Sequence, residues 1–343
     1  MKAIVAHAAK DLRVETRDMP TAGPGEVLVK IARGGICGSD LHYYSHGGFG
    51  AIRLREPMIL GHEVSGRVAD IGSDVRGLER GQLVAVSPSR PCYTCTYCLE
   101  GRHNHCLNMR FYGSAMPFPH IQGAFSEYVV ADPRQCVPAD GLSDAEAAVA
   151  EPLAVVLHAG RRAGDLMGKR VLVTGCGPIG QLAVLVARAA GAVSIVATDV
   201  TPFTLTKAEE VGADATHNVA TEAEPLARYA ADKGTFDVLF ECSGVAVALA
   251  GAVPAMRPGA IVMQLGLGGD MTLPMQAMTA KELDLRGSFR FHAEFSTAVE
   301  MMKAGRLDVK PLITHSFPVD EAVAAFDMAS DRSQAIKAQI AFS

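Results

Sequence analysis

Residues 170–199 have the sequence RVLVTGCGPIGQLAVLVARAAGAVSIVATD. An apolar run at 170–174 leads into a glycine-rich turn at 175–180, and an apolar stretch with helical spacing follows at 181–190. A second apolar run occupies 194–199. Strand, turn, helix and strand in this order predict a βαβ unit, in which the two strands run parallel.

The turn of this unit carries the spacing G-x-G-x-x-G. Because the motif follows a strand and opens a helix, its backbone can approach a pyrophosphate, and the helix N-terminus offers amide donors. The candidate cofactor residues in the turn are Gly175, Gly177, Pro178, Ile179 and Gly180. Asp199 ends the second strand, where a carboxylate accepts ribose hydroxyls and repels a 2′-phosphate. No arginine stands between Asp199 and Lys207, so we expect NAD as cofactor, with NADP as the alternative.

Further apolar strands follow at 238–240 and 260–263, with helical stretches between them. This alternation predicts a doubly wound parallel sheet. We therefore expect a cofactor-binding domain at residues 151–291. A helix-start pattern at Ser143 marks the approach to its first residue.

The chain before this domain shows short alternating apolar runs that are broken by glycines, which is typical of an irregular, mostly-β unit. After Arg290 the sequence returns to helical stretches and closes with a β-like segment at 337–342, which we expect to add a strand to the first unit. The predicted fold class is α/β, with one domain formed by residues 1–150 and 292–343 and the other by residues 151–291.

Composition narrows the class of partner. The chain has 343 residues, 49% of them hydrophobic, a formal net charge of −5 and no block of basic residues. A nucleic-acid partner is therefore not expected, and a small-molecule substrate is. The first residues form too short an apolar run for a signal peptide, and no apolar stretch reaches membrane-spanning length, so we expect a cytoplasmic protein without a membrane partner.

Four cysteines lie within fifteen residues in the pattern C-x-x-C-x-x-C followed by seven residues and a further cysteine. They are Cys92, Cys95, Cys98 and Cys106. Four soft ligands in one short loop suit tetrahedral zinc with no open coordination position. An iron–sulfur cluster is the rival interpretation, but its bacterial pattern needs three residues before a Cys-Pro, whereas Leu107 follows the last cysteine here. We predict a structural zinc site.

A second set of metal ligands lies upstream, in the glycine-flanked segments at 34–42 and 61–63. A catalytic zinc needs three protein ligands and one open position, and Cys37 and His62 are the natural first two. The third is either Glu63, if the backbone bends at Gly61, or Glu151, from the junction of the domains. Both carboxylates stay as candidates.

These segments resemble the zinc-containing medium-chain alcohol and polyol dehydrogenases, in the branch that includes sorbitol and L-idonate dehydrogenases. The similarity covers essentially the whole chain and follows one order of motifs, at 34–44, 61–64, 92–106, 109–116, 151–155 and 287–291. The resemblance implies a GroES-like catalytic domain, a Rossmann cofactor domain, and a homo-oligomer, either dimer or tetramer. It also implies two zinc ions per chain.

The same resemblance assigns roles to single residues. Ser39 would hydrogen-bond the substrate hydroxyl and His42 would pass its proton outward, a role that suits an imidazole titrating near neutrality. With Glu63 these two are the predicted catalytic residues. The residues expected to border the nicotinamide are Leu265, Gly266, Leu267, Phe289 and Arg290. A cation should face an acidic substrate, and Arg110 and Arg290 are the candidates.

The sequence therefore predicts zinc-dependent oxidation of a secondary hydroxyl of a sugar acid or polyol, with hydride transfer to NAD. L-Idonate is the favoured substrate because residues 109–116 resemble the aldonate-oxidising branch. Sorbitol, xylitol and threonine are the alternative substrates. A non-catalytic zinc-binding module is the remaining alternative, but such a protein has no need of an open metal site.

Overall fold

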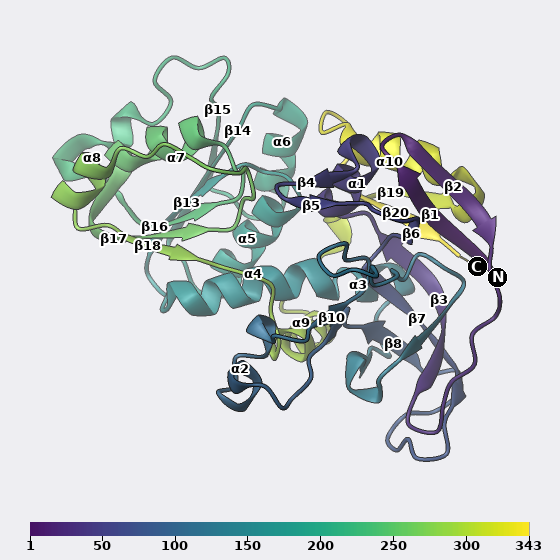
Figure 1. The fold of residues 1–343 in the computed structure, drawn as a ribbon. Coiled ribbons are helices and arrows are strands. Elements are labelled where there is room, and N and C mark those ends of the chain that lie inside the picture. The colour runs from purple at the N-terminus through teal and green to yellow at the C-terminus, as the bar shows by residue number, and fades with distance from the viewer. Residues whose placement is uncertain (343) are drawn as a thin grey trace.

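The structure is a computed structural model that describes residues 1–342; Ser343, the last residue of the predicted first domain, lies outside the described residues. Figure 1 shows two bodies side by side, each built on a sheet, with the N- and C-terminal ends of the chain close together on one of them. None of the helices in residues 1–342 combines the length and the apolar character that crossing a membrane requires.

The cofactor-domain sheet has six strands in the order β15-β14-β13-β16-β17-β18, and every neighbouring pair is parallel. In chain order, the strands are β13 (Arg170–Thr174), β14 (Ser194–Asp199), β15 (Ala215–Asn218), β16 (Phe236–Glu241), β17 (Met256–Gln264) and β18 (Asp284–Gly287). Val171 and Val173 belong to one core cluster while Leu172 belongs to another. Because successive side chains of a strand point to opposite faces, both faces of the sheet are covered, as the continuous apolar runs predicted.

The other body is built on a seven-stranded sheet in which β12, β8, β7, β3, β20 and β19 are neighbours in turn, and β11 also pairs with β3. The strands are β3 (Val27–Gly35), β7 (Glu63–Ile71), β8 (Leu83–Val86), β11 (Tyr128–Ala131), β12 (Cys136–Pro138), β19 (Ile313–Pro318) and β20 (Lys337–Ala341). Since β20 pairs with β3, the closing segment joins this sheet as the sequence predicted.

Smaller pairings complete the strands: β1 (Lys2–Ala8) lies between β2 (Asp11–Thr16) and β6 (Met58–Ile59), β4 (Gly48–Phe49) pairs with β5 (Ile52–Arg53), and β9 (Ser89–Arg90) pairs with β10 (Arg110–Phe111). The α-helices are α1 (Gly38–His46), α2 (Thr96–Leu99), α3 (Asp144–Ala148), α4 (Ala150–Ala163), α5 (Pro178–Ala189), α6 (Pro202–Glu210), α7 (Ala246–Ala252), α8 (Met275–Ala280), α9 (Glu294–Lys303) and α10 (Ala322–Ser330). Short 3₁₀ turns are η1 (His103–His105), η2 (Pro133–Gln135), η3 (Ala227–Tyr229), η4 (Ala231–Lys233), η5 (Val253–Ala255), η6 (Lys310–Leu312) and η7 (Val319–Glu321).

One helix begins earlier than the apolar spacing at 181–190 predicts. Helix α5 begins at Pro178 rather than at 181, because proline is preset for the first helical position. Helix α4 begins at Ala150, so Glu151 and Pro152 lie in its first turn, where proline removes no helical hydrogen bond. Ser143 caps α3 as predicted, in a capping box with Glu146. The domain boundaries at 150/151 and 291/292 stay predictions, since one apolar core includes buried residues from both sides of the first boundary.

Candidate active site

Cys37 lies between β3 and α1, at the N-cap of the helix. Asp40, in the first turn of α1, is completely buried and accepts hydrogen bonds from the backbone amides of Cys37 and Gly61, both at 3.1 Å. Burial raises the pKa of Asp40, and the charge of His62 acts in the opposite direction. One carboxylate therefore ties together the two segments that carry the predicted metal ligands.

The chain bends at Gly61, immediately before His62. Its φ of +91° lies in the left-handed region, and a Cβ at this position would come within 2.0 Å of the Phe125 ring, so only glycine fits. Strand β7 begins two residues later, at Glu63. The bend that was required for His62 and Glu63 to face the same ion is present, and the ligand atoms of Cys37, His62 and Glu63 all lie within 4.8 Å of one another.

His62 is buried, and its surroundings are those of a metal ligand. Burial pushes the pKa of His62 down, but the charges of Asp40 and Cys37 raise it well above its usual range. Nδ1 faces Asp40 Oδ1 at 3.7 Å and has no hydrogen-bond partner among the described residues. A histidine that binds a metal through one ring nitrogen commonly donates the other N–H to a carboxylate. The residues present therefore fit a zinc ion held by Cys37 and His62.

The two candidate third ligands have different partners. Glu63 is buried and accepts hydrogen bonds from Lys337 Nζ on β20, at 2.9 Å to Oε1 and 2.7 Å to Oε2. Glu151 is buried in the first turn of α4, and α4 packs against β7, the strand that begins at Glu63. Burial raises the pKa of Glu151 to about 7, while His62 lowers it and Glu63 raises it. The site thus holds two carboxyl groups around Cys37 and His62, and one of them is paired with a buried ammonium group.

The four predicted structural ligands form a second cluster, with their sulfur atoms within 4.8 Å of one another. Backbone amides point at these sulfurs: the amide of Cys92 lies 3.2 Å from Cys106 Sγ, and that of Cys95 lies 3.4 Å from Cys92 Sγ. Hydrogen bonds from Thr94 help to lower the pKa of Cys92 to about 5. All eight cysteines of the described chain are free thiols. Amide donors that stabilise thiolates fit a bound metal ion.

Ser39 and His42, the predicted proton path, lie three residues apart on α1 and so occupy one face of the helix. Partial burial and the neighbouring His46 lower the pKa of His42. Its ring is exposed and lies 5.7 Å from the Phe49 ring, which suits a group that exchanges protons with solvent. The transfer itself stays a prediction.

The glycine-rich turn lies between β13 and α5, with Gly177 as the N-cap of the helix and Pro178 at its first position. A Cβ on Gly180 would come within 1.9 Å of Gly175 O, whereas one on Gly177 would meet open space. Asp199 accepts hydrogen bonds from the amides of Cys176 at 2.6 Å and Thr201 at 3.0 Å. The carboxylate therefore lies directly beside the turn, and the open backbone there fits an approaching pyrophosphate.

Glu241, at the end of β16, organises the loops where the nicotinamide would lie. It is completely buried and accepts hydrogen bonds from the amides of Ser243 at 2.9 Å and Gly244 at 3.1 Å, and from Gln264 Nε2 at 2.6 Å. Its backbone carbonyl accepts from the amides of Leu265 and Gly266, both at 2.9 Å. The backbone carbonyl of Glu241 thus fixes the start of the predicted 265–267 segment, and its carboxylate fixes residues 243–244 and the Gln264 side chain, while the Leu267 side chain is exposed.

Arg290 is the candidate cation that reaches the catalytic cluster. Its guanidinium lies 4.2 Å from the centre of the Phe111 ring, and that ring lies 5.5 Å from the ring of His62. Burial lowers the pKa of Arg290 and the charge of Glu151 raises it. Arg110 is exposed, and because neighbours in a strand point to opposite sides, it faces away from the side that Phe111 occupies. The geometry favours Arg290 over Arg110 as the substrate cation.

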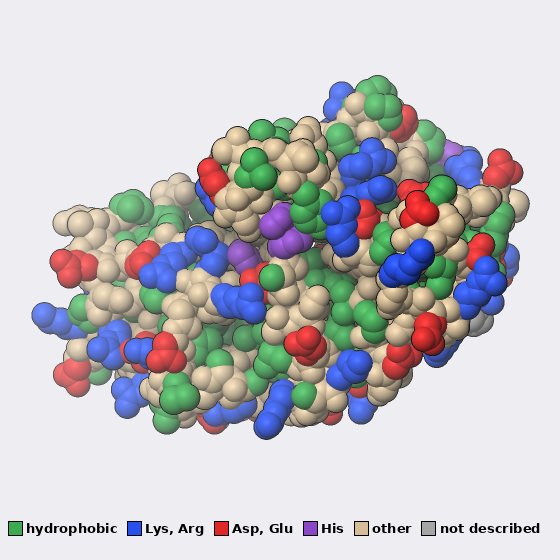
Figure 2. Space-filling model, turned by 90° about the horizontal axis from the view of Figure 1, so that it is seen from below, with side chains coloured by type: hydrophobic (Ala, Val, Ile, Leu, Met, Phe, Trp, Pro, Cys, Tyr) green, Lys and Arg blue, Asp and Glu red, His purple; other side chains and the backbone are tan. Residues whose placement is uncertain are grey.

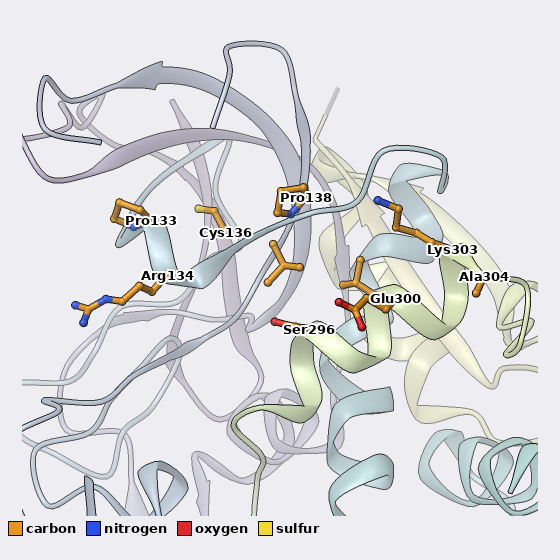
Figure 3. Close-up of a pocket in the computed structure, with 10 residues that line it drawn as sticks. Pro133, Arg134, Cys136, Pro138, Ser296, Glu300, Lys303 and Ala304 are labelled. Atoms are coloured by element: carbon orange, nitrogen blue, oxygen red, sulfur yellow. The ribbon is translucent and has the colours of Figure 1, made fainter. Parts of the chain in front are cut away.

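A cavity of about 580 Å³ lies elsewhere, between η2, β12 and α9 (Figure 3). It is lined by side chains that include Arg134, Cys136, Glu300 and Lys303. None of the predicted zinc, cofactor or substrate residues lines it. This cavity is therefore separate from the candidate active site.

Three site residues were given no role from the sequence: Asp40, Lys337 and Glu241. Asp40 stands inside a segment that had been singled out, so its position next to Cys37 was a usable signal. Lys337 begins a strand that is almost entirely buried, and a buried lysine in such a strand requires an opposite charge. Glu241 ends a buried strand of the cofactor domain, where polar groups commonly face the ligand.

Comparison with known proteins agrees with this geometry. Residues 23–141 match the alcohol dehydrogenase GroES-like domain, and residues 178–304 match the zinc-binding dehydrogenase domain. The chain is 45% identical to L-idonate 5-dehydrogenase (NAD(P)(+)) of Escherichia coli over 92% of this chain and 91% of that protein. It is 37% identical to sorbitol dehydrogenase of Gallus gallus over 98% of this chain and 94% of that protein.

A solved structure gives the same result. The crystal structure of L-idonate 5-dehydrogenase from Escherichia coli superposes with a TM-score of 0.93 at 42% identity, covering 99% of this chain and 98% of that one. The resemblance found in the sequence is confirmed, and with it the α/β fold made of a GroES-like domain and a Rossmann domain. The chain belongs to the zinc-dependent, NAD(P)-linked medium-chain alcohol and polyol dehydrogenases.

Proposed function

We propose that this enzyme oxidises the secondary hydroxyl of a sugar acid, with L-idonate as the favoured substrate. The observation that carries the proposal is the position of Arg290, whose guanidinium lies over Phe111, the ring that neighbours His62 of the Cys37, His62 and Glu63 cluster. A planar guanidinium binds a carboxylate with two parallel hydrogen bonds, and L-idonate has a carboxylate where sorbitol has none. The identity to L-idonate 5-dehydrogenase of Escherichia coli supports this choice.

Two zinc ions per chain are part of the proposal. The four-cysteine loop would hold one, and Cys37 and His62 would hold the other. We propose Glu63 as the third protein ligand, because its oxygen lies within 4.8 Å of the ligand atoms of Cys37 and His62, and Glu151 as the alternative. When bound, the catalytic ion supplies a Lewis acid that makes the substrate hydroxyl easier to deprotonate.

The side chains of the protein would orient the substrate, move the proton and hold the ligand and the loops in place. Ser39 would orient the substrate hydroxyl, and His42, whose pKa is lowered, would receive the released proton at a ring nitrogen and return it to solvent. Asp40 would hold the His62 ring through Nδ1. Glu241 would keep the loops at 243–244 and 265–267 in place where the nicotinamide, when bound, would supply the hydride acceptor.

For the cofactor we propose a preference for NAD, with NADP accepted more weakly. Asp199 lies beside the glycine-rich turn, where its charge disfavours a 2′-phosphate. The related Escherichia coli enzyme is named for use of both cofactors. A homo-oligomer, dimer or tetramer, is also proposed, and sedimentation equilibrium would measure its size.

One set of initial rates tests the proposal. Zinc-loaded protein is assayed with L-idonate, sorbitol, xylitol and threonine, each with NAD and with NADP. The expected result is the largest kcat/KM with L-idonate and NAD. A larger value with sorbitol or xylitol would select the polyol alternative, which the identity to sorbitol dehydrogenase supports. Failure of every substrate would refute the assignment.

A further inference from the structure

Residues 288–293 connect β18 to α9, and Arg290 lies within this connection. The φ of Arg290 is +54°, in the left-handed region that non-glycine residues adopt only at a cost. Such a conformation persists when the surrounding structure holds it in place. The contacts of Phe289 and His292, on either side of Arg290, identify the residues that hold it.

The cysteine loop contacts this segment on both sides of Arg290. Asn104 Nδ2 donates a hydrogen bond of 3.0 Å to the backbone carbonyl of Phe289. The ring of His103 stacks on that of His292, with centres 4.0 Å apart and planes 20° apart. The ring of His105 lies 6.1 Å from that of Phe289, in a stacked orientation. Histidine side chains gather near the middle of the face shown in Figure 2.

All three contacting residues belong to η1, the turn His103–His105 that lies between Cys98 and Cys106. The turn is therefore part of the chain between two cysteines of the sulfur cluster. Tyr93, which follows the first cysteine, also contacts the stack, with its ring 5.2 Å from that of His103. The cysteine loop thus forms a support for residues 289–292 rather than an isolated projection.

Both ends of the segment are held by further hydrogen bonds. The Ser288 amide donates to Gln264 O on β17 at 3.0 Å, and the His292 amide donates to Glu294 Oε2 on α9 at 3.1 Å. Glu294 in turn accepts from Arg161 on α4 at 3.1 Å. The cysteine loop therefore contacts a segment whose first end is bonded to the cofactor-domain sheet and whose second end is bonded to α9.

Arg290 projects from this support toward the catalytic cluster. Its guanidinium lies between the rings of Phe111 and Phe289, at 4.2 and 4.9 Å from their centres, and 3.5 Å from Met116 Sδ. Aromatic and sulfur contacts set no strict direction for a cation, so the position of the guanidinium depends on the backbone that carries it.

We propose that Asn104 and His103 of the cysteine loop are positioning residues for the reaction, which hold residues 289–292 so that the Arg290 guanidinium stays beside the catalytic cluster. The inference rests on the proposed function, because the role of Arg290 in substrate binding is part of that function. It would give the predicted structural zinc a second role, since Cys92, Cys95, Cys98 and Cys106, when they hold the ion, would also hold η1 between them.

The first test is Asn104→Asp, which keeps the shape of the side chain and removes the amide that donates to Phe289. We expect kcat/KM for L-idonate to fall about tenfold, mostly through KM, because small displacements of a binding group are costly. The control is Arg102→Ala on the same loop, whose side chain contacts Glu100 and the Tyr97 ring. It should change kcat/KM less than twofold. Zinc content is measured for each variant.

A double-mutant cycle with Arg290→Ala separates positioning from a general loss of structure. If Asn104 acts through Arg290, Asn104→Asp should have no further effect on kcat/KM in the Arg290→Ala background. A merely structural role would lower kcat/KM by the same factor in both backgrounds, and this outcome would overturn the proposal. His103→Ala should likewise have no further effect on kcat/KM in the Arg290→Ala background. His103→Phe is its control, because the phenyl ring keeps the stacked contact and should keep most of the activity.

Hydrogen exchange measures the stability of residues 288–292 without any substrate. The amides of Ser288 and His292 are hydrogen-bonded, so exchange in the peptide that contains them reports on the support. We expect faster exchange there in zinc-loaded Asn104→Asp and His103→Ala than in the wild type or Arg102→Ala. Unchanged exchange would refute the positioning role. Wild-type protein that oxidises none of the substrates would refute the proposed function instead, while the exchange reading stays valid.

Discussion

The two clusters of predicted zinc ligands are built in different ways. The four cysteines of the loop lie within fifteen residues, and backbone amides of the same loop point at their sulfurs. Cys37, the consecutive pair His62 and Glu63, and Glu151 come from three separate segments of the fold, and Lys337 on β20 is paired with the Glu63 carboxylate. A local ligand set closes around an ion and stabilises a loop. Ligands that come from separate segments can leave one coordination position open for substrate, and their geometry depends on the fold of the whole domain.

The largest expected effect concerns the assembled cluster. Cys37→Ala removes one of the three proposed protein ligands, and we expect kcat/KM to fall about 10⁴-fold or more, because a bound metal supplies several kcal/mol of transition-state stabilisation. Steady-state rates measure this, and metal analysis should show one zinc per chain in place of two. Turnover by zinc-free wild-type protein would contradict the assignment.

The loop should respond in the opposite way. We expect Cys95→Ala to lower the free energy of unfolding by about 4 kcal/mol, because a loop with little apolar core depends on its metal. The loss is limited to about this size because part of the loop can unfold locally without the rest of the protein. Urea titration followed by circular dichroism measures the loss. Turnover of the molecules that stay folded should fall far less than in Cys37→Ala. Equal losses of activity in the two variants would end the distinction between the sites.

Lys337 distinguishes the two clusters further, because it pairs with Glu63 of the catalytic cluster and the cysteine cluster, among the described residues, has no carboxylate that needs a buried cation. Lys337→Met leaves the Glu63 charge unpaired, and we expect the free energy of unfolding to fall by about 3 kcal/mol in zinc-free protein. If Glu63 is the third ligand, the ion compensates its charge, and the loss should shrink when zinc is bound. The double variant Glu63→Gln with Lys337→Met is the control, since it removes both charges. A loss that is the same with and without zinc would favour Glu151 as the ligand.

The sequence predicted the features that depend on neighbouring residues in the chain, and it did not predict those that depend on tertiary contacts. The βαβ unit and the cysteine loop depend on neighbours in the chain, so spacing alone located β13, β14 and the four cysteines. The partners Glu63 and Lys337 are 274 residues apart, and no local pattern connects them. The role of Asp40 as a link between Cys37 and Gly61 depends on a tertiary contact, as do the contacts of Asn104 with Phe289. Arg110 and Arg290 were equivalent candidates until the direction of β10 separated them.

The smallest expected effect lies where the cysteine loop touches the segment that carries Arg290. Burial, together with His103, lowers the pKa of His292 to about 4, while Glu294 acts in the opposite direction. The unfolded chain binds a proton at this histidine near pH 6.5, so stability is complete above that pH and falls as the pH decreases toward 4. Because solvent screens a half-buried ring, we expect the loss to be about 1 kcal/mol.

His292→Phe isolates this effect, since it keeps an aromatic ring against His103 and removes the proton. Urea unfolding of both proteins at pH 7.5, 6 and 5 gives the comparison: the wild type should lose more stability than the variant between pH 6.5 and 5. Loss of zinc from the thiolates at low pH affects both proteins and cancels in the difference. Parallel pH curves would show that His292 does not link the cysteine loop to the catalytic segment through its charge. The uncharged stacking contact would then be the only connection at this position.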